Sequence, residues 1–157
     1  MSNLAETTFQ TVAGDSLPMG DWAGKVVLVV NTASKCGFTR QYDKLQKLHD
    51  RFGPDGLVVL AVPSNDFRQE LADGAAVQQF CEVKFGLTIP MADITAVRGA
   101  RAHPFYQAVK SETGFEPKWN FNKVLVGRDG KVVATFGAMV EPDGAKMLRA
   151  IETALAA

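Results

Sequence analysis

Two unbroken runs of apolar residues lie in the first half of the chain, at Val26–Val30 and Leu57–Val62. Runs of this length that are rich in β-branched residues are typical of strands buried on both faces, as in a parallel sheet covered by helices. Between them, apolar residues recur three and four positions apart, which predicts a helix over Tyr42–Phe52. Together the three segments predict a β-α-β unit, which is expected to be right-handed.

Further apolar segments continue this alternation of strands and helices. A hairpin is expected before the first buried strand, and a second one around the turn Gly127–Gly130. The predicted order β-α-β-α-α-β-β-α is that of a thioredoxin-like α/β fold, with a central mixed sheet and helices on both faces, formed by residues 1–157 as a single domain. The remaining expected elements are strands at Phe9–Val12, Leu17–Trp22, Val124–Val126 and Lys131–Phe136, and helices at Gly74–Phe85, His103–Lys110 and Pro142–Leu155.

The composition narrows the class of protein. Of the 157 residues, 46% are hydrophobic and 22% are charged, which is ordinary for a globular protein. Lys and Arg number 17 and so do Asp and Glu, so nothing predicts a surface for nucleic acid or for an anionic membrane. No apolar run approaches the roughly 20 residues that span a bilayer, and the start lacks a secretory signal. We therefore expect a soluble cytoplasmic protein whose two cysteines are free, catalytic or redox-active.

Cys36 lies between the end of the first buried strand and the start of the first helix. In open α/β sheets this edge is where ligands bind, and a helix amino end favours a thiolate over a thiol. We expect Thr39 to cap the helix, and the loop Pro63–Glu70 to lie beside Cys36, because both loops leave the same edge of the sheet. The alternative is that Cys36 is a buried and inert thiol, as most free cysteines are.

Neutral hydrogen-bond donors around this sulfur would favour the thiolate and orient a peroxide. Gln69 lies in the loop after the second strand, and Trp119 and Asn120 precede the third. An indole N–H only donates, and amide side chains donate without titrating. By residue type alone, Trp119 could equally be a core aromatic and Gln69 a solvated loop residue. The two histidines have no metal-ligand spacing with the cysteines, and no Cys-x-x-Cys pair is present.

Three motifs resemble the signatures of the glutathione peroxidase family, and they occur in the family's order. They are NTASKCGFT at Asn31–Thr39, PSNDFRQE at Pro63–Glu70 and KWNF at Lys118–Phe121. The resemblance implies an antioxidant thiol peroxidase, active in the response to oxidative stress, with Cys36 as the peroxidatic residue. By motif position the assisting residues are Gln69, Trp119 and Asn120.

The second motif departs from the usual form of the family at one place, and one further segment of the chain also resembles the family. Only Arg68 stands where the family usually has one more residue and a glycine pair, so Asn65 is an alternative to Gln69. The segment Phe80–Pro90 resembles the one that carries a resolving cysteine in the cysteine-containing branch, and the resemblance implies that Cys81 is the resolving thiol. By residue type alone, Cys81 could equally be a plain core residue. A disulfide needs Cα atoms within about 7 Å. Because the two cysteines belong to different helices, we expect them to lie apart, so that the bond requires partial unwinding of the Cys81 helix.

The resemblance also implies the partners. Hydrogen peroxide and organic hydroperoxides are the expected substrates, and thioredoxin, or else glutathione, is the expected reductant. No metal or organic cofactor is expected, because the oxidising equivalent resides on sulfur. The short segment Ser111–Lys118 favours a monomer. Two alternatives stay open, a peroxide sensor or redox relay and a non-catalytic thioredoxin-like binding module. A peroxiredoxin is disfavoured because Ala33 stands where that family has threonine.

Overall fold

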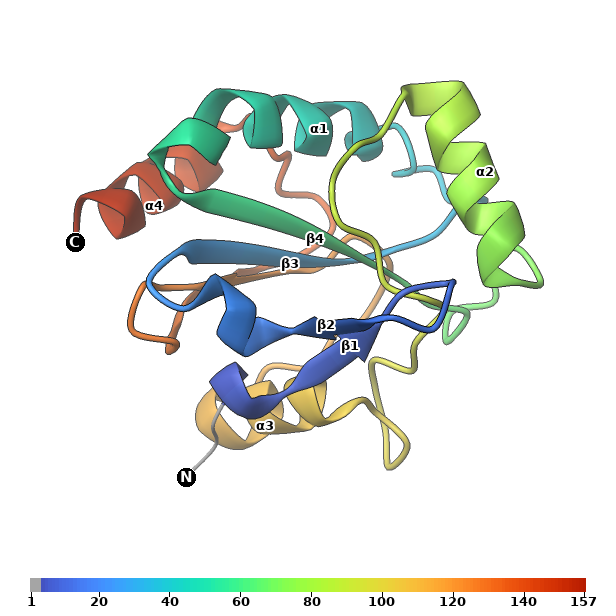
Figure 1. The fold of residues 1–157 in the computed structure, drawn as a ribbon, viewed down its shortest axis with the longest axis horizontal. Helices are drawn as coiled ribbons and strands as arrows, with labels where there is room; N and C mark the ends of the chain where they lie inside the picture. The colour runs from blue at the N-terminus through green and yellow to red at the C-terminus, as the bar shows by residue number, and fades with distance from the viewer. Residues whose placement is uncertain (1–3) are drawn as a thin grey trace.

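A four-stranded mixed sheet forms the centre of the computed structural model, which describes residues 4–157 (Figure 1). The strand order is β4-β3-β5-β6, with β3 and β4 parallel and the other two pairs antiparallel. A separate two-stranded hairpin, β1 with β2, precedes the sheet. The strands are β1 (Thr8–Gln10), β2 (Ser16–Pro18), β3 (Val26–Thr32), β4 (Leu57–Pro63), β5 (Lys123–Val126) and β6 (Val132–Phe136).

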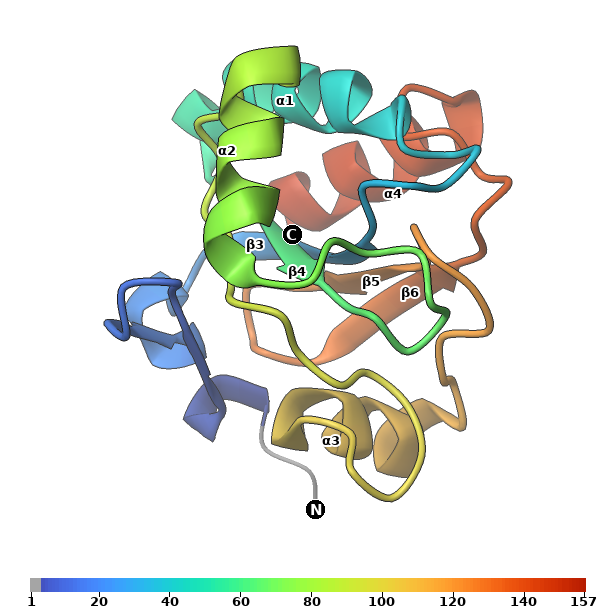
Figure 2. The ribbon, with the colours of Figure 1, turned by 90° about the vertical axis from the view of Figure 1, so that its right-hand side faces the viewer.

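Helices cover both faces of this sheet. Helices α1, α2 and α4 lie on one side, and α3 lies with the N-terminal hairpin on the other (Figure 2). The predicted thioredoxin-like order of strands and helices is therefore confirmed. Within residues 4–157 no helix has the length and apolar character needed to cross a membrane. The helices are α1 (Gln41–Phe52), α2 (Gly74–Phe85), α3 (Pro104–Thr113) and α4 (Ala145–Ala156).

Strand β3 is buried on both faces, which accounts for the unbroken apolar run in its sequence. Val26, Leu28 and Val30 point into the core under α1 and α4. Val27 and Val29 point into the second core, which is shared with α3 and the N-terminal hairpin. Every residue of β3 is buried, because side chains alternate between two covered faces. The strand thus delivers the residues that follow it to the open carboxyl edge of the sheet.

Several predicted boundaries are wrong. The first hairpin strand ends at Gln10 rather than Val12, and the second ends at Pro18, because Met19–Trp22 form a 3-10 helix. Helix α3 continues to Thr113 and ends at Gly114, whose φ of 79° is left-handed. Helix α4 begins at Ala145 rather than Pro142, because a turn with a hydrogen bond from Gly144 N–H to the Glu141 carbonyl precedes it. Thr39 does not cap α1, since Arg40 occupies the cap position and makes no side-chain cap hydrogen bond.

Candidate active site

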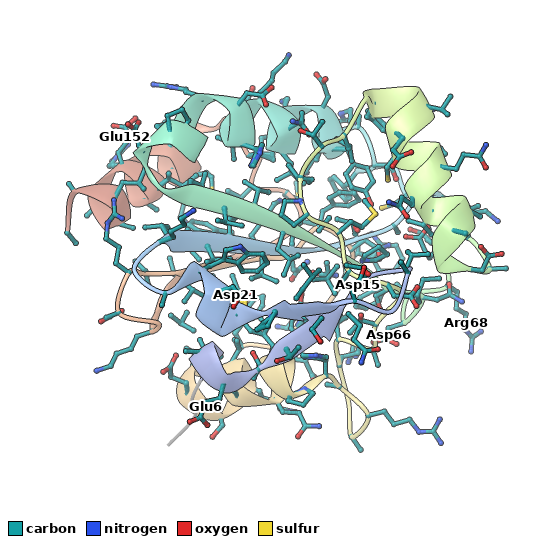
Figure 3. All side chains as sticks on the ribbon, viewed as in Figure 1. Glu6, Asp15, Asp21, Asp66, Arg68 and Glu152 are labelled. Atoms are coloured by element: carbon teal, nitrogen blue, oxygen red, sulfur yellow. The ribbon has the colours of Figure 1, made fainter. Side chains whose placement is uncertain are left out.

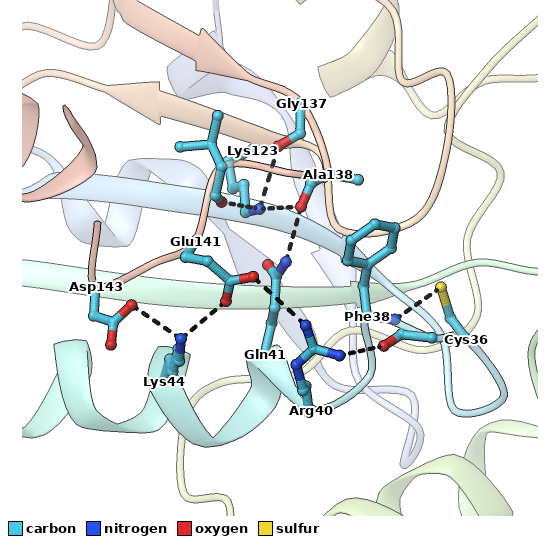
Figure 4. Close-up of polar contacts among 12 residues, drawn as sticks. Cys36, Phe38, Arg40, Gln41, Lys44, Lys123, Gly137, Ala138, Glu141 and Asp143 are labelled. Carbon is cyan, nitrogen blue, oxygen red and sulfur yellow. Dashed lines mark hydrogen bonds and ion pairs between the residues drawn. The ribbon is translucent and has the colours of Figure 1, made fainter. Parts of the chain in front are cut away.

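Cys36 lies half-buried in the loop between β3 and α1. Its Sγ accepts a hydrogen bond from the Phe38 backbone N–H at 3.4 Å (Figure 4). The Cys36 N–H donates to Thr39 Oγ1 at 3.0 Å, and that hydroxyl donates to the Ala33 carbonyl at 2.8 Å. Both hydrogen bonds of the Thr39 hydroxyl lie within this loop, so the hydroxyl does not cap helix α1. The turn directs a backbone N–H at the sulfur.

The loop after β4 lies against the Cys36 loop, as predicted. The Lys35 N–H donates to the Gln69 carbonyl at 2.9 Å. This contact follows from the parallel pairing of β3 and β4, whose carboxyl ends meet at one edge. Arg68, just before Gln69, has a φ of 60°, and its side chain extends outward from the loop (Figure 3). The shortened loop thus reaches the Cys36 segment through a left-handed residue where a glycine would be easier.

Gln69 and Asn120 are brought into direct contact. Asn120 is fully buried, and its Nδ2 donates to Gln69 Oε1 at 3.0 Å. The alternative residue Asn65 is exposed and uses its Oδ1 to accept the Glu70 N–H at 3.2 Å. Gln69 is therefore the amide of this loop that faces the third motif.

The third motif is anchored to the end of β3. The Asn31 side chain donates to the Trp119 carbonyl at 2.8 Å, and the Phe121 N–H donates to the Asn31 carbonyl at 2.6 Å. The Trp119 ring packs against Phe67, with ring centroids 5.3 Å apart. Its residue is 37% exposed, so the alternative of a core aromatic is wrong. Trp119 instead lies at the surface beside the loop that carries Gln69.

The sequence correctly predicted which loops lie near the Cys36 sulfur, but it did not predict which group donates a hydrogen bond to that sulfur. Among residues 4–157, the hydrogen bond that reaches Cys36 Sγ comes from the Phe38 backbone rather than from Gln69, Trp119 or Asn120. No side-chain pattern could have indicated this donor, because it belongs to the main chain. In the same range, no group of three or more His, Cys, Asp or Glu residues is arranged to hold a metal ion.

Glu70 is a second feature that sequence reasoning did not single out. It is only 6% exposed, and its Oε1 accepts the Ser34 N–H at 3.1 Å and the Leu71 N–H at 2.8 Å. Burial raises the pKa of this carboxyl, and its hydrogen bonds with Ser34 and Leu71 partly oppose that rise. The available signal was the position of Glu70 at the end of the second motif, where the two loops meet.

Cys81 is buried on the inner side of α2 and is 1% exposed. Burial raises the pKa of this thiol to about 11. Both cysteines are free thiols. Behind Cys81, a cavity of about 360 Å³ lies between α2, the β1–β2 turn and the segment Leu87–Met91. The expectation that the two cysteines lie too far apart for a bond stays a prediction.

The loop after β6 is fastened beside the start of α1. The Nζ of the buried Lys123 donates to the Val140 carbonyl at 2.6 Å, and Gln41 Nε2 donates to the Ala138 carbonyl at 2.8 Å (Figure 4). Glu141 pairs with Lys44 at 3.0 Å. These contacts fix the segment against the helix that begins just after Cys36.

Comparisons with known proteins indicate the family of this chain. The family model described as glutathione peroxidase matches residues 4–110. A glutathione peroxidase of Lactococcus lactis subsp. cremoris is 42% identical over 135 residues, which are 83% of this chain and 86% of that protein. A hydroperoxy fatty acid reductase of Synechocystis sp. is 42% identical over 141 residues, 83% of each chain. A crystal structure described as Trgpx in apo form superposes with a TM-score of 0.79 at 34% identity, covering 99% of this chain and 97% of the other.

Proposed function

The chain belongs to the glutathione peroxidase family and is a thiol peroxidase, and we propose that Cys36 is the sulfur that attacks the hydroperoxide. The observation that carries this assignment is the hydrogen bond from the Phe38 N–H to Cys36 Sγ, in a loop that also binds the Gln69 carbonyl. This N–H group holds the sulfur in place at the open edge of the sheet, and a thiolate there is the attacking nucleophile. Half-burial leaves the sulfur within reach of a substrate.

The first step consumes one hydroperoxide. The Cys36 thiolate attacks the O–O bond and keeps one oxygen, becoming a sulfenic acid. The other oxygen leaves as water or as an alcohol after it takes up a proton. Hydrogen peroxide and organic hydroperoxides are both proposed substrates, in line with the similarity to the hydroperoxy fatty acid reductase of Synechocystis.

Gln69, Asn120 and Trp119 are proposed to hold the peroxide against the sulfur. The Gln69 oxygen is occupied by Asn120, so the Gln69 amide N–H groups are the part left for a substrate oxygen. The side-chain oxygen of Asn120, Oδ1, is buried without a partner among the described residues. Trp119 is exposed on the same side and can cover a bulky substrate with its ring.

Cys81 is proposed to resolve the sulfenic acid as a disulfide, which thioredoxin then reduces by exchange. Of the residues of α2, Val77 and Cys81 are buried, so few contacts oppose the opening of this helix. The helix also ends at Gly86, whose φ of 61° already departs from the helical conformation. Glutathione is the alternative reductant. We propose that the chain works as a single-domain monomer in the cytoplasm.

Mass spectrometry after one equivalent of peroxide tests the assignment. A Cys36–Cys81 disulfide is expected in the wild type, a stable Cys36 sulfenic acid in Cys81→Ser, and no peroxide consumption in Cys36→Ser. Full peroxidase activity in Cys36→Ser would rule out the assignment. Turnover of Cys81→Ser with thioredoxin alone would remove the resolving role and leave the peroxidase, and a clear preference for glutathione would overturn the proposed reductant.

A further inference from the structure

The cavity behind Cys81, with a volume of about 360 Å³, is lined by three segments that lie outside the Cys36 loop. They are the turn that joins β1 to β2, the inner side of α2 and the segment Leu87–Met91, which adjoin one another in both views of the ribbon (Figure 1 and Figure 2). Binding sites for small molecules have volumes of about 300 Å³ and more, so this cavity has the size of a small ligand.

Two of the three walls are fixed by hydrogen bonds. In the β1–β2 turn, the Thr11 N–H donates to the Asp15 carbonyl at 2.8 Å, and the Asp15 N–H donates to Thr11 Oγ1 at 3.0 Å. In the segment Leu87–Met91, the Pro90 carbonyl accepts the N–H of Ala61 in β4 at 3.0 Å. These contacts give the turn a defined shape and join the segment to the sheet, so both walls are formed before a ligand binds.

The third wall belongs to α2, the helix that has to open if Cys81 is to reach Cys36. This helix contributes Gln78, Cys81 and Glu82 to the lining. Because Val77 and Cys81 are the buried residues of α2, this wall is held by fewer core contacts than a fully packed helix would be. The cavity is therefore complete only while α2 is closed.

The lining combines buried apolar residues with exposed carboxylates. Leu87 and Ile89 are 8% and 6% exposed, and burial of an apolar ligand against them would supply affinity. Asp15 and Glu82 are the charged residues of the lining, both at exposed positions, and neither forms an ion pair within residues 4–157. A ligand with an apolar body and a positively charged head group matches this arrangement. The other apolar side chains of the lining, apart from Ala13 and Pro90, are those of Val12, Leu17 and Met91.

We propose that this cavity binds a small organic cation, an amine or a guanidinium with an apolar body, and that the bound cation keeps α2 closed. The binding of the cation stands on the cavity alone, whereas its effect on catalysis rests on the proposed resolving role of Cys81. Opening of α2 removes Gln78, Cys81 and Glu82 from the wall, so the ligand binds the closed form. The cation therefore inhibits disulfide formation and leaves the attack of Cys36 on the hydroperoxide unchanged.

The size of the inhibition follows from the binding equilibrium. A ligand that binds only the closed form lowers the open population by the factor 1 + [L]/Kd. Because the helix opens before the two sulfur atoms meet, a ligand at ten times its Kd should slow disulfide formation about elevenfold. The Cys36 loop contributes no residue to the lining of this cavity among residues 4–157, so the loss of the Cys36 thiol should keep its rate.

Three probes that share one apolar body test the class of ligand. At neutral pH phenylbutylamine is a cation, phenylbutanol is uncharged and phenylbutyrate is an anion. Calorimetric titration of the reduced full chain should show the amine binding about tenfold more tightly than the butyrate, and amide NMR shifts should fall in the three walls. The double variant Asp15→Asn with Glu82→Gln should weaken binding of the amine about fivefold. The matched control, Glu6→Gln with Asp21→Asn, removes the same charge from exposed positions outside the lining and should leave binding unchanged.

Rapid quenching after one equivalent of peroxide tests the effect on catalysis, because it separates the loss of the Cys36 thiol from the appearance of the disulfide. With phenylbutylamine at ten times its Kd, we expect the second step alone to slow about elevenfold. A bound amine that leaves both rates unchanged, or slows both equally, would overturn the coupling to α2.

The calorimetric and NMR results decide the cation site by themselves. No binding of the amine, equal affinity for amine and butyrate, NMR shifts outside the three walls or undiminished binding to the Asp15 and Glu82 double variant would each overturn it. If the wild type without a probe forms no Cys36–Cys81 disulfide, the proposed resolving role fails, and the titrations still test whether the cavity binds a cation.

Discussion

Lys123 gives the most quantitative prediction, because it is a cation at the start of β5 with 0% exposure. Its Nζ donates to the carbonyl oxygens of Gly137, Ala138 and Val140 at 3.3, 3.4 and 2.6 Å. Burial lowers the pKa of this lysine to about 8, although the negative charge of Glu141 opposes the change. The perturbation is Lys123→Met, which keeps a long, flexible side chain and removes the titrating group.

The sign and size follow from proton linkage. In the unfolded chain the pKa of Lys123 returns to 10.5, so between about pH 8 and 10.5 the unfolded state holds a proton that the folded state has released. Stability rises with pH wherever the unfolded state binds more protons, by about 1.4 kcal/mol per pH unit for one group. Across this window the wild type should therefore gain roughly 3 kcal/mol relative to Lys123→Met. Below about pH 8 the difference between the two proteins should be constant.

Urea unfolding followed by circular dichroism, with reductant present, measures this difference. Comparing the two proteins at each pH cancels Cys81, whose raised pKa acts in the opposite direction above about pH 9. The matched control is Lys131→Met, at an exposed position in the turn before β6, where we expect a change within about 0.5 kcal/mol throughout. If the difference in unfolding free energy between wild type and Lys123→Met does not change with pH, the reasoning is refuted. The three carbonyl oxygens around Nζ would then keep the lysine charged.

Three further predictions concern stability. His103 accepts the Phe105 N–H through Nδ1 at 3.0 Å, and burial lowers its pKa from 6.5, so the folded chain binds this proton less tightly than the unfolded chain. The stability difference between wild type and His103→Asn, which keeps a capping side chain, should shrink as pH falls below about 6.5 in urea titrations. Asp73→Ala removes the N-cap of α2 and should lower stability by about 1 kcal/mol, with faster hydrogen exchange in that helix. Arg68→Gly relieves a φ of 60° and should raise the unfolding free energy by about 1 kcal/mol.

The fold was predictable where local pattern and burial agree. Helix α1 and strands β3 and β4 lie within two residues of their predicted bounds, because their apolar positions face the core. Helix α2 has few buried residues, and it matches its predicted bounds because Gly86 ends it. The start of α4 was misplaced because Pro142 suits a first helical turn, yet it is buried in the preceding turn. The end of α3 was misplaced although Gly114 was an available stop signal.

The site was predictable only as a neighbourhood. The parallel pairing of β3 and β4 indicates that the loops after these two strands meet, and the motifs indicate which of their residues belong to the site. The atoms that touch were not predictable, because they depend on tertiary turns. The Thr39 hydroxyl accepts a hydrogen bond from the Cys36 N–H in its own loop, and the backbone N–H of Phe38 donates to the Cys36 sulfur. The Glu70 carboxylate connects the two loops, because it accepts the Ser34 N–H.

The contact between Gln69 and Asn120 shows most clearly why packing has to supply what local sequence does not. Each amide adjoins a non-glycine residue in the left-handed region, Arg68 at φ 60° and Phe121 at φ 58°. Such a residue costs about 1 kcal/mol or more, so neither conformation is a local preference. Phe121 is held there by full burial and by an edge contact with Tyr42, with ring centroids 5.4 Å apart. The core therefore stabilises the backbone that turns Asn120 toward Gln69, and the orientation of the two amides is a property of the folded chain rather than of either motif.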